Sequence, residues 1–190
     1  MSGPPPVSEA RARAAHVLGR VWTDRAYAAA ALDTELSTVS DPRDVGLVTE
    51  LVYGVLRTQG YLEAELASLS RQGRAFDHPE ALAHLLMGMY SIAFLDRVPA
   101  FAAVSEAVNG VLAAIGPKPA GFANAVLRGF ARKLEQSGRP SQERAALEGA
   151  AGWLRGALRR SLGRKGAEAF LAAGPVPPPQ GIAVAAPAER

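Results

Sequence analysis

The spacing of apolar residues predicts helices along most of the chain. After Ser8, which stands where an N-cap is expected, apolar side chains recur at i, i+3, i+4, i+7 and i+8, as on one face of a helix. This stripe consists of Ala14, Val17, Leu18, Val21 and Trp22. A short second helix is expected near residues 27–36. It is followed by Asp41-Pro42, which suits a helix start because Asp can cap and Pro fits the first helical position.

The helix that begins at Pro42 is expected to continue past Gly60, since apolar residues keep helical spacing as far as Leu69. Asp77 predicts the next helix start, with Glu80 as its capping-box partner. The apolar face of that helix is wide, which predicts a central position in the fold. Its expected inward residues are Leu82, Leu85, Leu86, Met89, Ile92 and Ala93.

Val98-Pro99 predicts a further helix start, with an apolar stripe that ends near Ile115. The segment 116–119, Gly-Pro-Lys-Pro, predicts a loop, and the stripe behind it predicts a helix over residues 120–136. Residues 182–184 are the only candidate strand. The pattern therefore predicts an all-α fold, a bundle of seven to nine helices.

Segments rich in Gly, Pro and Ala divide the chain into four parts. Residues 1–7 are expected to be a disordered lead, and residues 8–136 to form the helical domain. Residues 137–173 are expected to form a helical extension or linker, and residues 174–190 a Pro/Ala-rich tail. The weaker helices of the extension are expected at residues 142–162 and 165–173.

Composition narrows the function classes. The chain has no cysteine, which excludes disulfides, thiolate metal sites and a cysteine nucleophile. His16, His78 and His84 are scattered, so we expect no metal site, and no motif predicts a cofactor. No apolar run of about 18 residues predicts a membrane span. The N-terminus lacks the basic and apolar segments of a secretory signal, so a cytoplasmic location is expected.

Charge is distributed unevenly, although the net charge is only +3. Between residues 24 and 96, five basic side chains stand against eleven acidic ones, whereas between residues 128 and 165 ten basic side chains stand against three. The second region could present a basic surface to phosphates, or it could be a solvated helix face. Charge alone does not separate these readings.

Three segments, in this order and spacing, point to a family. They are ELVYGVLR at residues 50–57, VPAFAAVSEAV at residues 98–108 and GFANAVLR at residues 121–128. Together they resemble the NusB homology domain, which occurs alone in the antitermination factor NusB and as the N-terminal part of the rRNA cytosine-5 methyltransferase RsmB. The resemblance covers roughly residues 9–136, and the extension behind it resembles the helical linker of the methyltransferase form.

The resemblance implies an RNA contact at an arginine-rich N-terminal helix, and the matching positions here are Arg11 and Arg13. Two further candidate patches come from the basic residues themselves, whose contacts with phosphates would weaken as salt rises. The second patch is Arg128, Arg132 and Lys133, and the third is Arg155, Arg159 and Arg160 with the neighbouring Arg164 and Lys165.

The remaining motif residues are expected to be structural. Glu106 lies early in the helix that starts at Pro99, and its carboxylate could accept hydrogen bonds from a neighbouring helix N-terminus. Asn124 could bridge loop backbone groups. Gly54 inside a helix predicts close helix–helix approach. Arg57 and Tyr53 share a helix side, which favours packing over ligand contact.

These expectations favour an rRNA-positioning, RNA-binding domain of the RsmB type. The resemblance implies that methyl transfer needs a Gly-rich S-adenosylmethionine loop and two catalytic cysteines, so this sequence is not expected to be an enzyme on its own. One alternative is a stand-alone antitermination factor that binds RNA with a ribosomal protein. Others are a protein–protein module without RNA and membrane-surface binding through residues 153–165. A methyltransferase domain is a further possible partner.

Overall fold

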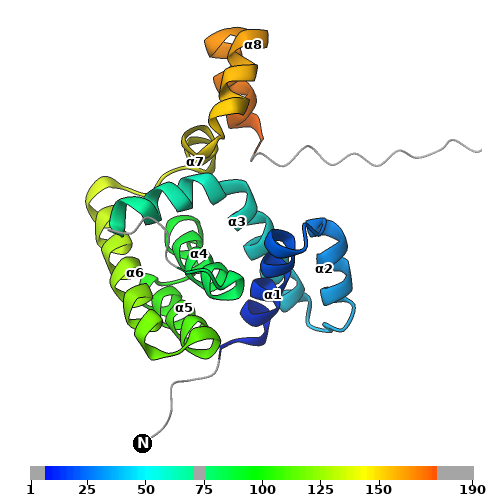
Figure 1. Ribbon diagram of the computed structural model, residues 1–190, viewed down its shortest axis with the longest axis vertical. Helices are drawn as coiled ribbons and strands as arrows, with labels where there is room; N and C mark the ends of the chain where they lie inside the picture. The colour runs from blue at the N-terminus through cyan, green and yellow to red at the C-terminus, as the bar shows by residue number, and fades with distance from the viewer. Residues whose placement is uncertain (1–6, 71–75, 175–190) are drawn as a thin grey trace, which may run out of the picture.

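The computed structural model describes residues 7–70 and 76–174, which form eight helices and no strand (Figure 1). The all-α fold expected from the sequence is therefore confirmed. The helices are α1 (Glu9–Thr23), α2 (Ala28–Leu36), α3 (Pro42–Leu69), α4 (Pro79–Phe94), α5 (Ala100–Ile115), α6 (Pro117–Ser137), α7 (Gln142–Gly149) and α8 (Gly152–Ala173). None of the helices in these ranges is both long and apolar enough to cross a membrane.

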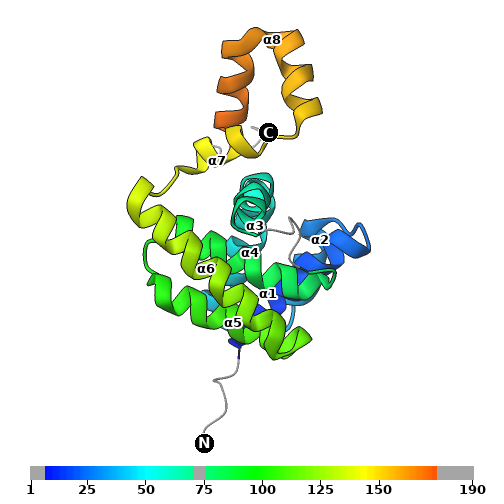
Figure 2. The same cartoon turned by 60° about the vertical axis from the view of Figure 1, so that its left-hand side comes forward.

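Helix α4 is the centre of the bundle. It packs against α1, α3, α5 and α6, which surround it in both views of the ribbon (Figures 1 and 2). Twelve of its 16 residues are buried. This agrees with the wide apolar face, although Leu82 is only half-buried. Burial extends to His84, Tyr90 and Ser91, whose polar groups the apolar pattern did not place in the core.

Two glycine contacts fix how α3 meets its neighbours. A Cβ at Gly54 would overlap the ring of Tyr90, so the absence of a side chain lets α3 and α4 approach closely. Further along α3, a Cβ at Gly60 would overlap the backbone of Gly149 at the end of α7. Tyr90 joins the same helices, because its hydroxyl donates to Glu50 on α3 and accepts from Gln142 Nε2 on α7 at 3.4 Å.

Two predicted helix starts are wrong in detail. The cap of α4 is His78 rather than Asp77: its Nδ1 accepts from the backbone N–H of Ala81 at 3.4 Å, and Pro79 occupies the first helical position. The predicted loop at residues 116–119 is already helix from Pro117 onward, after Gly116 at φ 89°. Prolines are tolerated there because first-turn N–H groups have no intrahelical partner.

The C-terminal extension is a short helix followed by a helical hairpin. The chain breaks between α7 and α8, a break that the sequence did not predict, and α8 bends at Gly163, where φ is 68°. Helix α8 packs on α7 and projects away from the bundle (Figure 2). The predicted strand at residues 182–184, and nearly all of the predicted lead and tail, lie outside the described residues.

Candidate nucleic-acid interface

Arg11, the first predicted RNA contact, lies inside the bundle with 7 % of its surface exposed. It sits on α1 and faces α4 and α5. Its guanidinium donates to Ser91 Oγ at 3.3 Å and lies 3.9 Å from the carboxylate of Glu106. Burial lowers the pKa of Arg11 and Glu106 partly opposes this, but an arginine remains charged under such conditions. The contacts are those of a structural ion pair.

Glu106 also holds the start of α1. Its Oε2 accepts a hydrogen bond from the backbone N–H of Ser8 at 3.3 Å, the contact with a neighbouring helix N-terminus that the sequence suggested. The hydroxyl of Ser8 is buried without a hydrogen-bond partner within the described residues, so Ser8 contributes its backbone rather than a side-chain cap. Glu106 therefore ties α5 to α1 through both a backbone group and Arg11.

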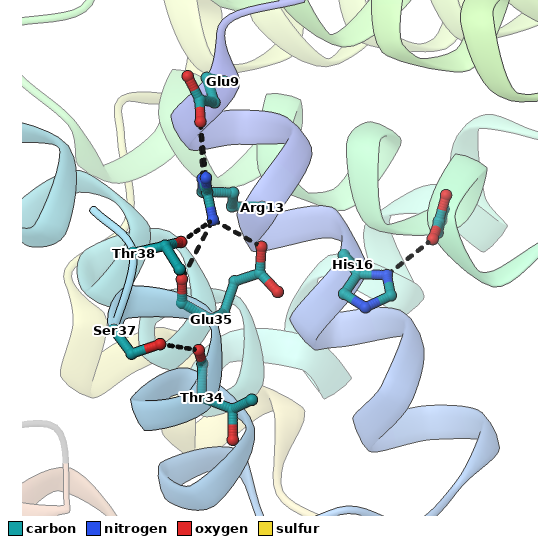
Figure 3. A network of polar contacts seen from close by, with 8 residues as sticks. Glu9, Arg13, His16, Thr34, Glu35, Ser37 and Thr38 are labelled. Carbon is teal, nitrogen blue, oxygen red and sulfur yellow. Dashed lines mark hydrogen bonds and ion pairs between the residues drawn. The ribbon is translucent and has the colours of Figure 1, made fainter.

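Arg13, the second predicted RNA contact, points toward α2 and is surrounded by acceptors (Figure 3). Each guanidinium nitrogen donates: Nε and Nη2 to Glu9, and Nη1 to the carbonyl and carboxylate of Glu35 and to Thr38 Oγ1, at 2.7–3.1 Å. Hydrogen bonding to Glu9 raises the pKa of Arg13. With an acceptor already at each of its three guanidinium nitrogens and its side chain 22 % exposed, Arg13 has little capacity for a phosphate.

Arg11 and Arg13 are therefore both engaged in contacts within the protein. Moving either onto RNA would break internal contacts and leave Glu106, or Glu9 and Glu35, without their cation. Such a loss is expensive where the partner is buried. This geometry argues against Arg11 and Arg13 as phosphate contacts and gives them the role of joining helices.

The second patch divides between two faces of α6. Lys133 pairs with Glu65 on α3. Arg128 and Arg132 point toward α5 instead: both are exposed, and within the described residues neither has a carboxylate partner. Arg128 donates from Nε to Asn124 Oδ1 at 3.2 Å, so Asn124 orients this guanidinium and does not bridge a loop.

A groove of about 510 Å³ runs between α5 and α6, beside these two arginines. Its lining is Ala100, Phe101, Val104, Arg128, Ala131, Arg132 and Glu135. Phe101 is 78 % exposed, which is unusual for so large an apolar side chain. Two guanidinium groups, one carboxylate and an exposed aromatic ring therefore share one concave surface. The sequence did not single out Phe101.

The third patch spreads over the hairpin of α8. Arg155 and Arg159 line a small cavity shared with Glu148 and Glu168, without hydrogen bonds to them. Arg160 is exposed and makes no ion pair with any described residue. The same hairpin exposes apolar side chains, with Trp153 75 % and Phe170 60 % exposed. Its surface is therefore mixed in character.

Pro99 and Arg57 make contacts within the bundle, as the proposed structural role of the remaining motif residues requires. Pro99 precedes α5, and its carbonyl accepts from the first turn of that helix. Arg57 lies beside the hydroxyl of Tyr90, whose pKa is raised by burial and by its hydrogen bond to Glu50 and lowered in part by Arg57. No three metal-ligating side chains come together in residues 7–70 and 76–174.

Comparison with known proteins agrees with this architecture. A family model described as NusB family matches residues 8–132. Three relatives are called ribosomal RNA small subunit methyltransferase B. The one from Vibrio cholerae is 37 % identical over 63 % of this chain, that from Vibrio vulnificus 38 % over 66 %, and that from Xanthomonas campestris pv. campestris 31 % over 85 %.

The chain spans 28 %, 29 % and 35 % of the length of these three relatives, so only a part of each is compared. The family match covers α1 to α5 and most of α6, which include the central helix and the Glu106 contacts. The expected resemblance is confirmed on more than half of the sequence. This chain belongs to the NusB family.

Proposed function

We propose that this chain is an RNA-binding domain that positions ribosomal RNA for a cytosine-5 methyltransferase of the RsmB type. The α5–α6 groove is the observation that supports it, because Arg128 and Arg132 stand there without carboxylate partners among the described residues. Guanidinium groups on a concave surface that are not neutralised by a carboxylate suit phosphate oxygens, which arginine binds with its planar donor fork. The names of the relatives, which concern ribosomal RNA, supply the class of RNA.

The sequence of 190 residues has no cysteine, so we propose that it does not itself carry out the thiolate-dependent methyl transfer. We expect it to act in the cytoplasm, where ribosomal RNA is made and modified in bacteria. We also propose Arg160 as an accessory phosphate contact. Arg155 and Arg159 are proposed as weaker phosphate contacts, because carboxylates share their cavity.

A protein contact through α8 is the second candidate. The exposed rings of Trp153 and Phe170, with Leu162 50 % exposed, favour a folded partner over solvent. A methyltransferase domain or a ribosomal protein fits this role, and the latter would correspond to the antitermination-type function.

The primary test is fluorescence anisotropy with fragments of small-subunit ribosomal RNA. We expect binding whose log affinity falls linearly with log salt between about 50 and about 200 mM. Replacing both Arg128 and Arg132 by Ala should make that slope shallower by about 1.4 to 1.8, because each lost phosphate contact removes about 0.7 to 0.9. Lys133→Ala is the matched control on the same helix. Absence of binding by the wild-type chain even at low salt would overturn the proposal.

A further inference from the structure

Phe101 occupies an unusual place on α5. It lies in the first turn, beside Ala100, which packs on the core, yet Phe101 itself is 78 % exposed. The neighbouring Ala103 and Val104 are buried, so the helix packs against the bundle without using Phe101. Leaving an aromatic ring in water gives up the stabilisation that its burial would supply. A ligand that covers the ring would recover it.

The groove beside the ring has an apolar floor and charged edges. Ala100, Val104 and Ala131 supply the apolar lining, while Arg128 and Arg132 stand one helical turn apart on α6. Glu135 lies close to one turn beyond Arg132 and disfavours a phosphate at that end. The volume of about 510 Å³ falls in the range of small-ligand pockets, about 300 to 1,000 Å³, and is sufficient for one nucleotide.

We propose that this groove binds one unpaired RNA base, stacked on the ring of Phe101, with the adjoining phosphates on Arg128 and Arg132. This inference rests on the proposed function and adds the form of RNA that is bound. A base inside a duplex is already stacked on its neighbours, whereas a base in a single strand, loop or bulge can turn its face to an aromatic side chain. Stacking tolerates any base, so Phe101 contributes affinity with little sequence preference.

The test compares a single-stranded RNA with the same strand in a duplex. Phe101→Ala should weaken single-strand binding by about tenfold or more, the usual size of one stacking contact. Phe101→Tyr should retain the affinity, and Phe101→Leu should not, because leucine is apolar but offers no aromatic face. The duplex should bind all four proteins alike. Since Phe101 is exposed, these variants are expected to fold, which circular dichroism would verify.

Two further readouts separate stacking from charge. Phe101→Ala should leave the salt slope unchanged, whereas Arg132→Ala should make it shallower by about 0.7 for a single strand. A 2-aminopurine placed at successive positions of the strand should be quenched at one position by the wild-type chain and not by Phe101→Ala. Tyr27→Ala is the matched control, because Tyr27 is 86 % exposed but immediately precedes α2, which packs on α1 and α3.

The outcomes distinguish the two proposals. If the wild-type chain binds no RNA, the proposed function fails. If the wild-type chain binds RNA, and Arg128→Ala and Arg132→Ala lower the affinity while Phe101→Ala does not, only the stacking inference is overturned. Equal weakening of single-stranded and duplex RNA binding by Phe101→Ala would also overturn it, because the bases of a duplex are already stacked on one another.

Discussion

Arg11 and Arg132 carry the same guanidinium group in opposite surroundings. Arg11 is enclosed by α1, α4 and α5, and its charge is met by Glu106. Arg132 lies at the surface of α6, at the edge of a groove, without a carboxylate partner among the described residues. The N-terminal arginines join helices to one another, whereas the arginines of the groove lack a carboxylate partner among the described residues and are our proposed contacts with a polyanion.

The difference shows that an arginine count does not locate an RNA site. A guanidinium that is already hydrogen-bonded must lose those contacts before it can bind a phosphate, and the loss offsets the gain. An exposed arginine loses only water and some rotamer freedom. Substitutions can therefore separate the α5–α6 groove from the Glu106 contact region, formed by Ser8, Arg11, Glu106 and the adjacent His84.

The largest expected effect is the loss of folding stability at low pH that results from protonation of His84. Burial lowers the pKa of His84 to about 4 from an ordinary 6.5; Glu80 and Glu106 raise it slightly, and Arg11 lowers it further. The folded chain therefore binds this proton more weakly than the unfolded chain does. The contribution of the neutral His84 to stability is fully present above pH about 6.5. It is lost as the pH falls toward about 4, and the total loss is about 3 kcal/mol. Urea unfolding across this range would measure it.

His84→Gln is the control for that titration, since other groups also titrate in acid. The imidazole packs where a Cβ at Gly110 would overlap it, so a loss of stability in the variant that is the same at every pH leaves the comparison of slopes intact. The variant should lose less stability between pH about 6.5 and about 4 than the wild type. Equal slopes in both proteins would contradict the burial of a neutral imidazole. RNA binding per folded molecule should not depend on His84.

The next effect is expected from Arg11→Ala. It leaves Glu106, with 34 % of its side chain exposed, without its cation and removes a packed aliphatic stem. We expect a loss of about 2 kcal/mol in the free energy of unfolding, less than the value for a fully buried pair because water reaches Glu106. The double substitution Arg11→Met with Glu106→Gln should restore part of the lost free energy of unfolding. RNA affinity measured at saturating folded protein should stay within about twofold. A stable variant with tenfold weaker RNA binding would reverse the assignment.

The helices themselves could be predicted, because apolar periodicity reports directly on which face is buried. The burial of Arg11 also had a signal: it lies three residues before Ala14 and seven before Leu18, on the apolar stripe of α1. The pairing of Arg13 with Glu9 likewise follows helical spacing. The family resemblance, however, implied that both arginines contact RNA.

Other features depend on tertiary contacts that no local pattern encodes. Phe101 lies three residues before Val104, at core spacing, yet it is exposed, because Ala103, Val104 and Ala107 form the face of α5 that packs on the bundle. Lys133 and Arg132 are adjacent in sequence, but only Lys133 faces Glu65 across the α3–α6 contact. The groove therefore emerged from the arrangement of α5 and α6 rather than from a motif.

The smallest effect, and the closest comparison, concerns Lys133. The side chain of Lys133 is 44 % exposed but that of its partner Glu65 only 15 %, so Lys133→Ala should lower the free energy of unfolding by about 1 kcal/mol, near the upper end for a surface ion pair. Because its ammonium faces α3 instead of the groove, the salt slope of RNA binding should also stay unchanged. Arg132→Ala, one residue away, should cost less stability, because Arg132 makes no ion pair with a described residue, and it should make the slope shallower. If Lys133→Ala altered the slope as much as Arg132→Ala, the bound RNA would extend over the α3 side of α6, and the groove would not be the centre of the interface.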